Sequence, residues 1–210
     1  SIHSDDLALF SNSLTGFNDI FHGEGEVSGT IENLKSRDIQ LDIGSHTSFI
    51  GAAELYGLPD IYTTRLNIKA KRFISTSKDL AKLIDLDPVP AEFSRLGDLS
   101  YSGTFLGYLD DFTAKGKAST TIGDLSLDVS YSQKADSIPA YSGTLQSDNI
   151  NLKSLLDDQA LGTTSFDLSI RGKGLSASTL TTTLSGSVHH FGYANYDYKN
   201  IRIDGNVADR

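Results

Sequence analysis

Apolar and polar residues alternate with a period of two over most of this chain. Leu125, Leu127 and Val129, for example, are separated by Ser126 and Asp128. Because successive side chains of a β-strand point to opposite faces, each such run has one apolar and one polar face. The pattern is typical of half-buried antiparallel strands, not of the continuously apolar strands of a parallel sheet. The apolar faces of the predicted strands carry Ile39, Leu41, Ile43, Leu66, Ile68, Leu125, Leu127, Val129, Phe166, Leu168, Ile170, Ile201 and Ile203.

The alternation changes phase near the end of the chain. Tyr196 and Tyr198 occupy even positions, whereas Ile201 and Ile203 occupy odd positions. A shift of one residue reverses the facing of every later side chain in a strand. The segment Lys199-Asn200 is therefore predicted to hold a bulge or a tight turn.

A helical insert is predicted around residues 77–97. Thr76 or Ser77 suits the N-cap of its first helix, because a hydroxyl oxygen accepts a hydrogen bond from a free N–H of the first turn. Pro90 suits the first position of a second helix, and Gly97 suits its end. The remainder of the chain reads as strands and turns.

A third short helix is predicted around residues 152–158, with Asn151 as its cap. None of the three helices is long enough to be stable alone in water, so their apolar faces must lie on the sheet. There they act either as a lid over a hydrophobic edge or as a moving gate. Residues 1–210 are expected to form a single unit that contains these helices.

A short phrase recurs along the chain, as Ser28-Gly29-Thr30-Ile31, Ser102-Gly103-Thr104-Phe105, Ser142-Gly143-Thr144-Leu145 and Ser185-Gly186-Ser187-Val188. Recurrence at such intervals is typical of stacked-repeat proteins, and predicts several turns of one β-repeat. The alternative is that this phrase is common in any strand-rich protein.

Net charge, cysteine content and the length of apolar stretches exclude several classes of function for this chain. The net charge is −9 and the basic residues form no stripe, which argues against nucleic acid as a partner. The chain has no cysteine, so it has neither disulfides nor a thiol nucleophile. No stretch approaches the roughly 18 apolar residues that cross a bilayer. Ser1 and Arg210 both resemble cuts through a longer protein.

The sequence predicts no metal site, no cofactor and no catalytic residue. His189 and His190 are adjacent on a predicted strand, so their side chains are expected to diverge. The glycines of 23–29 resemble a dinucleotide fingerprint, but no helix follows them to hold a pyrophosphate. Acidic pairs occur at 5–6, 85/87, 110–111 and 157–158, in predicted turns and helix ends where carboxylates are simply solvated.

The apolar faces themselves are the remaining candidate for function. Strands added side by side merge these faces into a surface too large to leave exposed. The sheet either closes into a packed barrel or sandwich, or curls into a trough that holds an apolar guest. Burial of each CH₂ contributes about 0.8 kcal/mol, so an acyl chain of about 14 carbons would gain roughly 10 kcal/mol before entropy losses.

Three passages resemble the AsmA-like family, in particular its TamB branch in Bacteroidetes-type bacteria. They are Gly57-Leu58-Pro59-Asp60, the run from Leu96 to Phe105 with Asp111-Phe112 and Thr120-x-x-Gly123 after it, and Gly192-Tyr193 with the run from Tyr196 to Gly205. The resemblance covers most of the chain from about Gly25 onward.

The resemblance implies a taco-shaped β-trough in the periplasm, within a longer protein anchored in the inner membrane. It implies transport of phospholipid, or of another acyl-chain lipid, toward the outer membrane. It also implies a part in outer-membrane biogenesis, with a barrel-assembly partner, and offers no catalytic residues. Two alternatives remain: a module whose strand edges pair with outer-membrane protein clients, and a hydrolase on a β-scaffold.

Overall fold

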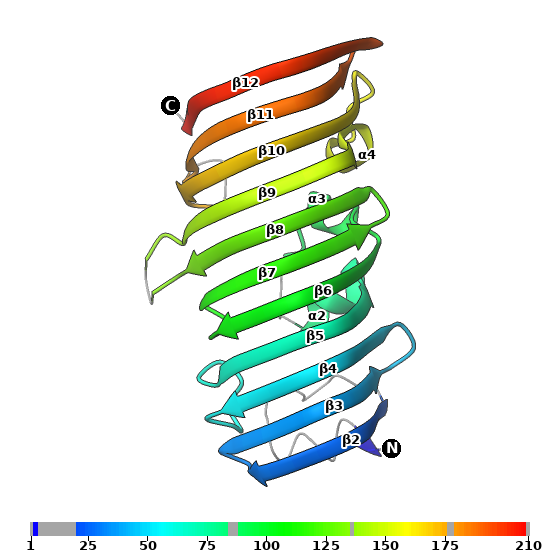
Figure 1. The fold of residues 1–210 in the computed structure, drawn as a ribbon, viewed down its shortest axis with the longest axis vertical. Helices are drawn as coiled ribbons and strands as arrows, with labels where there is room; N and C mark the ends of the chain where they lie inside the picture. Colours follow the sequence, from blue (N-terminus) through cyan, green and yellow to red (C-terminus); the bar gives the residue numbers. More distant parts are fainter. Residues whose placement is uncertain (1, 4–19, 84–87, 135–136, 176–178, 209–210) are drawn as a thin grey trace.

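The chain folds into one antiparallel sheet whose strands follow one another in sequence order. The structure is a computed structural model that describes residues 2–3, 20–83, 88–134, 137–175 and 179–208. In this part of the chain twelve strands lie side by side, each hydrogen-bonded to its neighbours in sequence (Figure 1). Strands account for 69% of the residues, so the predicted all-β, mainly antiparallel fold with a few short helices is confirmed.

Short connections explain this simple topology. Five of them contain only two or three residues, which is enough to join neighbouring antiparallel strands but not parallel ones. The elements are β1 (Ile2–His3), β2 (Ile20–Thr30), β3 (Asn33–Ile43), β4 (Thr47–Tyr56), β5 (Arg65–Thr76), α2 (Ser77–Leu83), α3 (Ala91–Ser94), β6 (Asp98–Gly107), β7 (Asp111–Thr120), β8 (Gly123–Ser132), β9 (Ala140–Asn151), α4 (Leu152–Leu156), β10 (Leu161–Lys173), β11 (Thr181–Tyr193) and β12 (Tyr196–Ala208).

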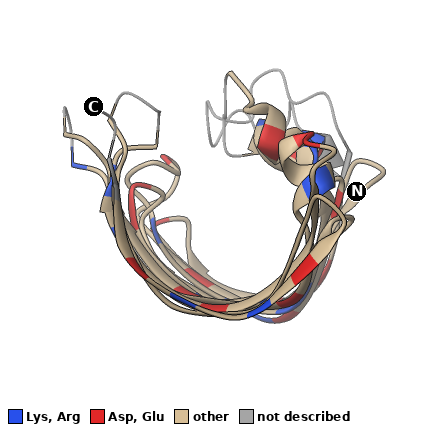
Figure 2. Cartoon of the chain, turned by 90° about the horizontal axis from the view of Figure 1, so that it is seen from above, with Lys and Arg blue, Asp and Glu red and all other residues tan. Residues whose placement is uncertain are grey.

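The sheet is open and strongly curved, so that it has a concave and a convex face (Figure 2). Bulges contribute to this curvature, because an extra residue bends its strand. The hydrogen-bonded ladder skips residues 37–38 of β3, 71–72 of β5, 148–149 of β9 and 189 of β11. These four bulges lie on odd-numbered strands, which run in the same direction, while the β10–β11 ladder also skips residues 162–163 of β10.

The short helices lie at one rim of the sheet, where odd-numbered strands end (Figure 2). The Thr76 hydroxyl accepts a hydrogen bond from the Asp79 N–H at 3.1 Å, so the predicted cap of α2 is confirmed. Asn151 caps α4 by accepting from the Ser154 N–H at 3.0 Å. Pro90 precedes the first helical residue of α3, one position earlier than predicted.

The predicted phase change in β12 is present. Asn200 has a φ of 57°, and the ladder leaves it and His189 opposite it unpaired. After Asn200 in the chain, Ile201 faces the concave side of the sheet. Before Asn200, Tyr198 pairs with Phe191 on that same concave face. Asparagine tolerates the left-handed backbone better than most residues, which explains why it stands at this position.

Few apolar side chains are fully buried. Among the described residues these are Leu66, Ala81, Ile122, Ile150 and Val188. A chain that packs a second layer against its sheet buries far more apolar residues. In the described part of the chain, the apolar face therefore has no closed core over it.

The recurring Ser-Gly phrase lies on β2, β6, β9 and β11. In each case the glycine has a positive φ, between 105° and 157°, and a Cβ would overlap the backbone of the neighbouring strand. The intervals between the phrases hold four, three and two strands. The shared feature is thus a glycine in close contact with the next strand, while the repeat itself stays a prediction.

Candidate functional site: the concave face of the sheet

The two faces of the sheet differ in exposure. In β6 and β7, half-buried and exposed residues alternate almost without exception. Because the sheet curves, side chains on its concave side crowd together and shield one another. The half-buried positions therefore form the concave face, and the exposed positions form the convex face.

One row of directly opposed residues shows that the concave face is continuous. Ile39 of β3 opposes Gly51, and the row then passes through Ala70 and two glycines to Leu127 of β8. From there it continues through Leu145 to Leu168, and through Gly186 to Ile203 at the edge. Opposed residues share a face, so four of the sequence-predicted lining residues lie on one line across ten strands.

Parallel rows on the same face contain the other predicted lining residues. Ile68 connects through Phe105 and Ala114 to Val129, and from there through Gly143 to Ile170. The structure thus brings together on the concave face Ile39, Leu41, Ile43, Leu66, Ile68, Leu125, Leu127, Val129, Phe166, Leu168, Ile170, Ile201 and Ile203.

Aromatic side chains also contribute to the concave face, whereas twelve of the thirteen lining residues predicted from the sequence are aliphatic. Phe105 stacks on Phe112 with ring centroids 4.7 Å apart, and Phe112 stacks on Tyr131 at 5.3 Å. The alternation along β6 indicates this placement. Tyr101 and Phe105 occupy odd positions, as does the half-buried Gly103 between them, so all three face the same side of the sheet.

A second aromatic group lies at the end of the concave face, in the β11–β12 hairpin. Phe191 lies 6.2 Å from Tyr193 and 6.4 Å from Tyr198, between ring centroids. Tyr196 lies 6.4 Å from Tyr198 and is 72% exposed. These residues extend the apolar rows to the rim.

Charged side chains lie on the convex face and pair there. The hydrogen bond and the charge of Lys71 lower the pKa of the Asp38 carboxyl, although β4 lies between their two strands. Lys115 donates to Asp128 directly opposite at 2.7 Å, and this carboxylate raises the pKa of Lys115. In the described residues of β3–β12, the rows of the concave face contain no charged side chain.

The two adjacent histidines do not diverge as predicted, because a bulge places both of them on the convex face. His189 Nε2 lies 2.9 Å from Asp167, and His190 Nε2 lies 3.7 Å from Asp197. At such a bulge, two successive residues oppose one and point to the same side. Each histidine still has its own carboxylate, and no group of three or more potential metal ligands occurs in the described part of the chain.

Of the four acidic pairs, those at 110–111 and 157–158 lie among the described residues. Asp110 precedes β7, and Asp157 ends α4, 3.3 Å from Arg95. The pairs at 5–6 and 85/87 lie outside the described residues. Near the rim, a polar depression of about 510 Å³ contains His46, whose Nδ1 lies 3.5 Å from Asp79.

None of the helices that the structure describes combines the length and the apolar character needed to cross a membrane. Comparison with protein-family models, with curated proteins and with solved structures finds no match to this chain.

Proposed function

We propose that the concave face shields the acyl chains of a lipid. The observation that carries this proposal is that the apolar rows cross the described strands β3–β12 without a charged side chain, while most of their side chains are only half-buried. Apolar surface of this extent is rarely left in contact with water in a soluble protein. An elongated apolar guest that lies across several strands would cover it.

The chemistry of the face favours acyl chains over a polar ligand. Leu127, Leu145 and Leu168 follow one another directly across three strands and offer only hydrocarbon. Each CH₂ transferred from water onto such a surface contributes about 0.8 kcal/mol. The open side of the curve leaves room for a charged headgroup in water while its chains lie on the sheet.

The family expected from the sequence agrees with this function. A TamB-type or AsmA-like segment in the periplasm would pass phospholipid, or another acyl-chain lipid, along the concave face toward the outer membrane. Support for this proposal comes from the sequence motifs together with the curved sheet and its apolar rows.

Native mass spectrometry of the chain after incubation with phosphatidylethanolamine vesicles tests the proposal. We expect bound phospholipid, and its loss in Leu127→Asp and Leu168→Asp, which place a carboxylate among the apolar rows. The matched controls are Ser130→Asp and Ser169→Asp, at exposed positions on the convex face of the same strands. Circular dichroism verifies that each variant is folded. Absence of lipid from the unmodified chain, or equal loss in the control variants, would overturn the proposal.

A further inference from the structure

The middle of the convex face carries a basic patch on β5 and β7. The patch consists of five exposed residues, Lys69, Lys71, Arg72, Lys115 and Lys117. The ladder places Lys69 opposite Thr104 of β6, and Thr104 opposite Lys115. Neighbouring strands lie about 4.8 Å apart, so the two groups of cations stand about 9.6 Å apart on either side of β6.

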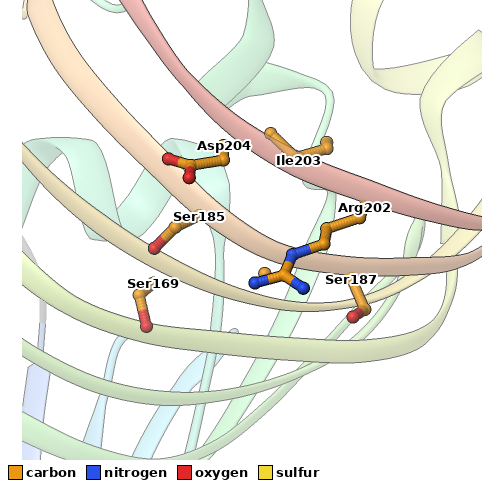
Figure 3. Close-up of a pocket in the computed structure, with 7 residues that line it drawn as sticks. Ser169, Ser185, Ser187, Arg202, Ile203 and Asp204 are labelled. Atoms are coloured by element: carbon orange, nitrogen blue, oxygen red, sulfur yellow. The ribbon is translucent and has the colours of Figure 1, made fainter.

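Negative charge is kept to the ends of these strands. All residues of β5–β7 are described, and their only acidic residues are Asp98 and Asp111, which begin β6 and β7 at opposite rims. Other regions of the convex face mix both signs of charge. On β12, for example, Arg202 and Asp204 stand on either side of Ile203 (Figure 3). The basic patch differs from such a mixed region, because its centre carries one sign of charge.

Most of this positive charge is not neutralised within the described part of the chain. Two of the five cations pair with an acid from outside β5–β7, which is Asp38 of β3 or Asp128 of β8. The other three form no ion pair among the described residues: Lys69, Arg72 and Lys117. The sequence shows no basic stripe, because the patch arises only when β5 and β7 come to lie beside β6.

Hydroxyl groups and apolar side chains complete this surface. Ser102 and Thr104 are exposed on the convex side of β6, where they can donate hydrogen bonds to phosphate oxygens. On the same side, Leu106 of β6 is 41% exposed and Ile74 of β5 is 37% exposed. Basic side chains attract anionic lipid headgroups, while apolar side chains enter the boundary between headgroups and acyl chains.

The curvature of the sheet puts the basic patch where a flat surface can touch it. Seen along the long axis, the sheet bends along its strands, and the strands follow nearly the same curve (Figure 2). The middles of the strands therefore lie on the outermost line of the convex face. Because β5 spans 65–76 and β7 spans 111–120, the five cations lie near this line.

We propose that the basic patch docks the chain onto a membrane surface that contains anionic phospholipid. Lipid phosphates contact the cations of β5 and β7 and the hydroxyls of β6, with Leu106 and Ile74 at the headgroup boundary. Nucleic acid fits less well, because the convex side of the described strands β5–β7 has no aromatic side chain on which bases could stack. The inference rests on the convex face alone and holds whatever the concave face binds.

Vesicle cosedimentation tests this docking. We expect the chain to bind vesicles of equal parts phosphatidylglycerol and phosphatidylcholine, and to bind phosphatidylcholine alone much more weakly. Binding should weaken as salt rises from about 0.1 M to about 1 M, because the Debye length falls from about 10 Å to about 3 Å. Equal binding to both vesicles, or binding that salt does not weaken, would overturn the proposal. Tighter binding of single-stranded DNA than of the anionic vesicles would also overturn it.

Charge removal locates the docking surface. A triple variant with Lys69→Gln, Arg72→Gln and Lys117→Gln keeps both ion pairs of the patch. Each cation near an anionic surface strengthens binding about fivefold, so this variant should bind the anionic vesicles about a hundredfold more weakly. The matched control removes three exposed cations from α4, β10 and β12, with Lys153→Gln, Lys173→Gln and Lys199→Gln, and should lose much less. Circular dichroism verifies that both are folded, and equal losses would overturn the proposal.

A tryptophan in place of Leu106 tests the contact itself, because the chain has no tryptophan of its own. In Leu106→Trp the emission should shift to shorter wavelength on the anionic vesicles, since the indole enters the headgroup region, and should not shift with phosphatidylcholine alone. An unshifted emission from chain that sediments with the anionic vesicles would contradict docking by this face. The triple variant at 69, 72 and 117 should still carry phosphatidylethanolamine in the native mass spectrum, so this inference and the proposed function can fail separately.

Discussion

Tyr101 donates a hydrogen bond to the carbonyl oxygen of Lys115, 3.0 Å away on the next strand. The same hydroxyl lies 2.9 Å from the carbonyl oxygen of Thr104. To reach both, the phenol ring lies flat over two opposed glycines, Gly103 and Gly116. An aromatic ring over cross-strand glycines covers backbone that would otherwise face water, and it fixes the register of the pair.

This arrangement predicts two different losses of stability. Tyr101→Phe keeps the ring but removes the hydroxyl, and should lower the free energy of unfolding by about 1 kcal/mol. Gly116→Ala should cost more, because a Cβ there would overlap the Ser102 carbonyl oxygen and lie 2.8 Å from Gly103 Cα and 2.9 Å from the Tyr101 ring. Urea denaturation measures both. A Gly116→Ala variant as stable as the unmodified chain would contradict the close approach of Gly116 to β6 and to the Tyr101 ring.

The ion pair between Asp38 and Lys71 predicts a pH effect. Because Lys71 lowers the pKa of Asp38 in the folded state, the pair favours folding at pH values above the carboxyl's unfolded pKa. This contribution disappears as the pH falls through the lowered, folded-state value. In Lys71→Gln the pKa of Asp38 should rise toward its ordinary value, as measured by NMR titration of the carboxyl carbon.

Lys69 provides the matched control for this titration. It lies on the same face of β5 but forms no ion pair with Asp38. In Lys69→Gln the pKa of Asp38 should therefore stay low. If the pKa of Asp38 were the same in Lys71→Gln as in the unmodified chain, the bridge over β4 would not exist in solution.

The left-handed backbone of Asn200 predicts an unusual tolerance for glycine within a strand. Its φ of 57° strains most side chains, and β-branched ones most of all. Asn200→Val should lower the stability by roughly 1–2 kcal/mol, while Asn200→Gly should change it by only a few tenths. Thermal unfolding followed by circular dichroism distinguishes the two. Equal melting temperatures for both variants would contradict a left-handed residue at this position.

The Asn200 irregularity shows how far the sequence alone leads. The change from even to odd apolar positions located it, because facing in a strand is a strictly local property. The same local rule placed the thirteen predicted lining residues, twelve of them aliphatic, on the apolar faces of their strands. The caps Thr76 and Asn151 were equally local signals, since a cap needs only its own side chain and the first turn.

Features that depend on how neighbouring strands pair could not be predicted from the alternation within one strand. The bulges at 71–72 and 189 lie between concave residues on even and on odd positions, Ala70 and Phe73, and Val188 and Phe191, but the residues that the ladder skips become apparent only when the strands are paired. His189 and His190 were therefore assigned to opposite faces, although the bulge turns both to the convex side. Stacking of Phe105 on Phe112 likewise depends on register across two strands.

Arg95 connects two helices that are far apart in the sequence. Its guanidinium donates to the carbonyl oxygen of Leu155 at 3.1 Å and to the Asp157 carboxylate at 3.3 Å. Both partners belong to the end of α4, whereas Arg95 itself follows α3. Helices of four and five residues are unstable alone, so this bridge should matter more to them than to the sheet.

Arg95→Met keeps an apolar stem but removes both hydrogen bonds. We expect amide hydrogen exchange to become faster in peptides that cover α3 and α4, with little change in the strands. The loss in global stability should be about 1 kcal/mol or less, because the Arg95 side chain is 31% exposed and Asp157 is mostly in water. The matched control is Arg72→Met, which removes an exposed arginine on the convex face without an ion pair. Unchanged exchange in α4 of Arg95→Met would show that the two helices are held independently, each by its own contact with the sheet.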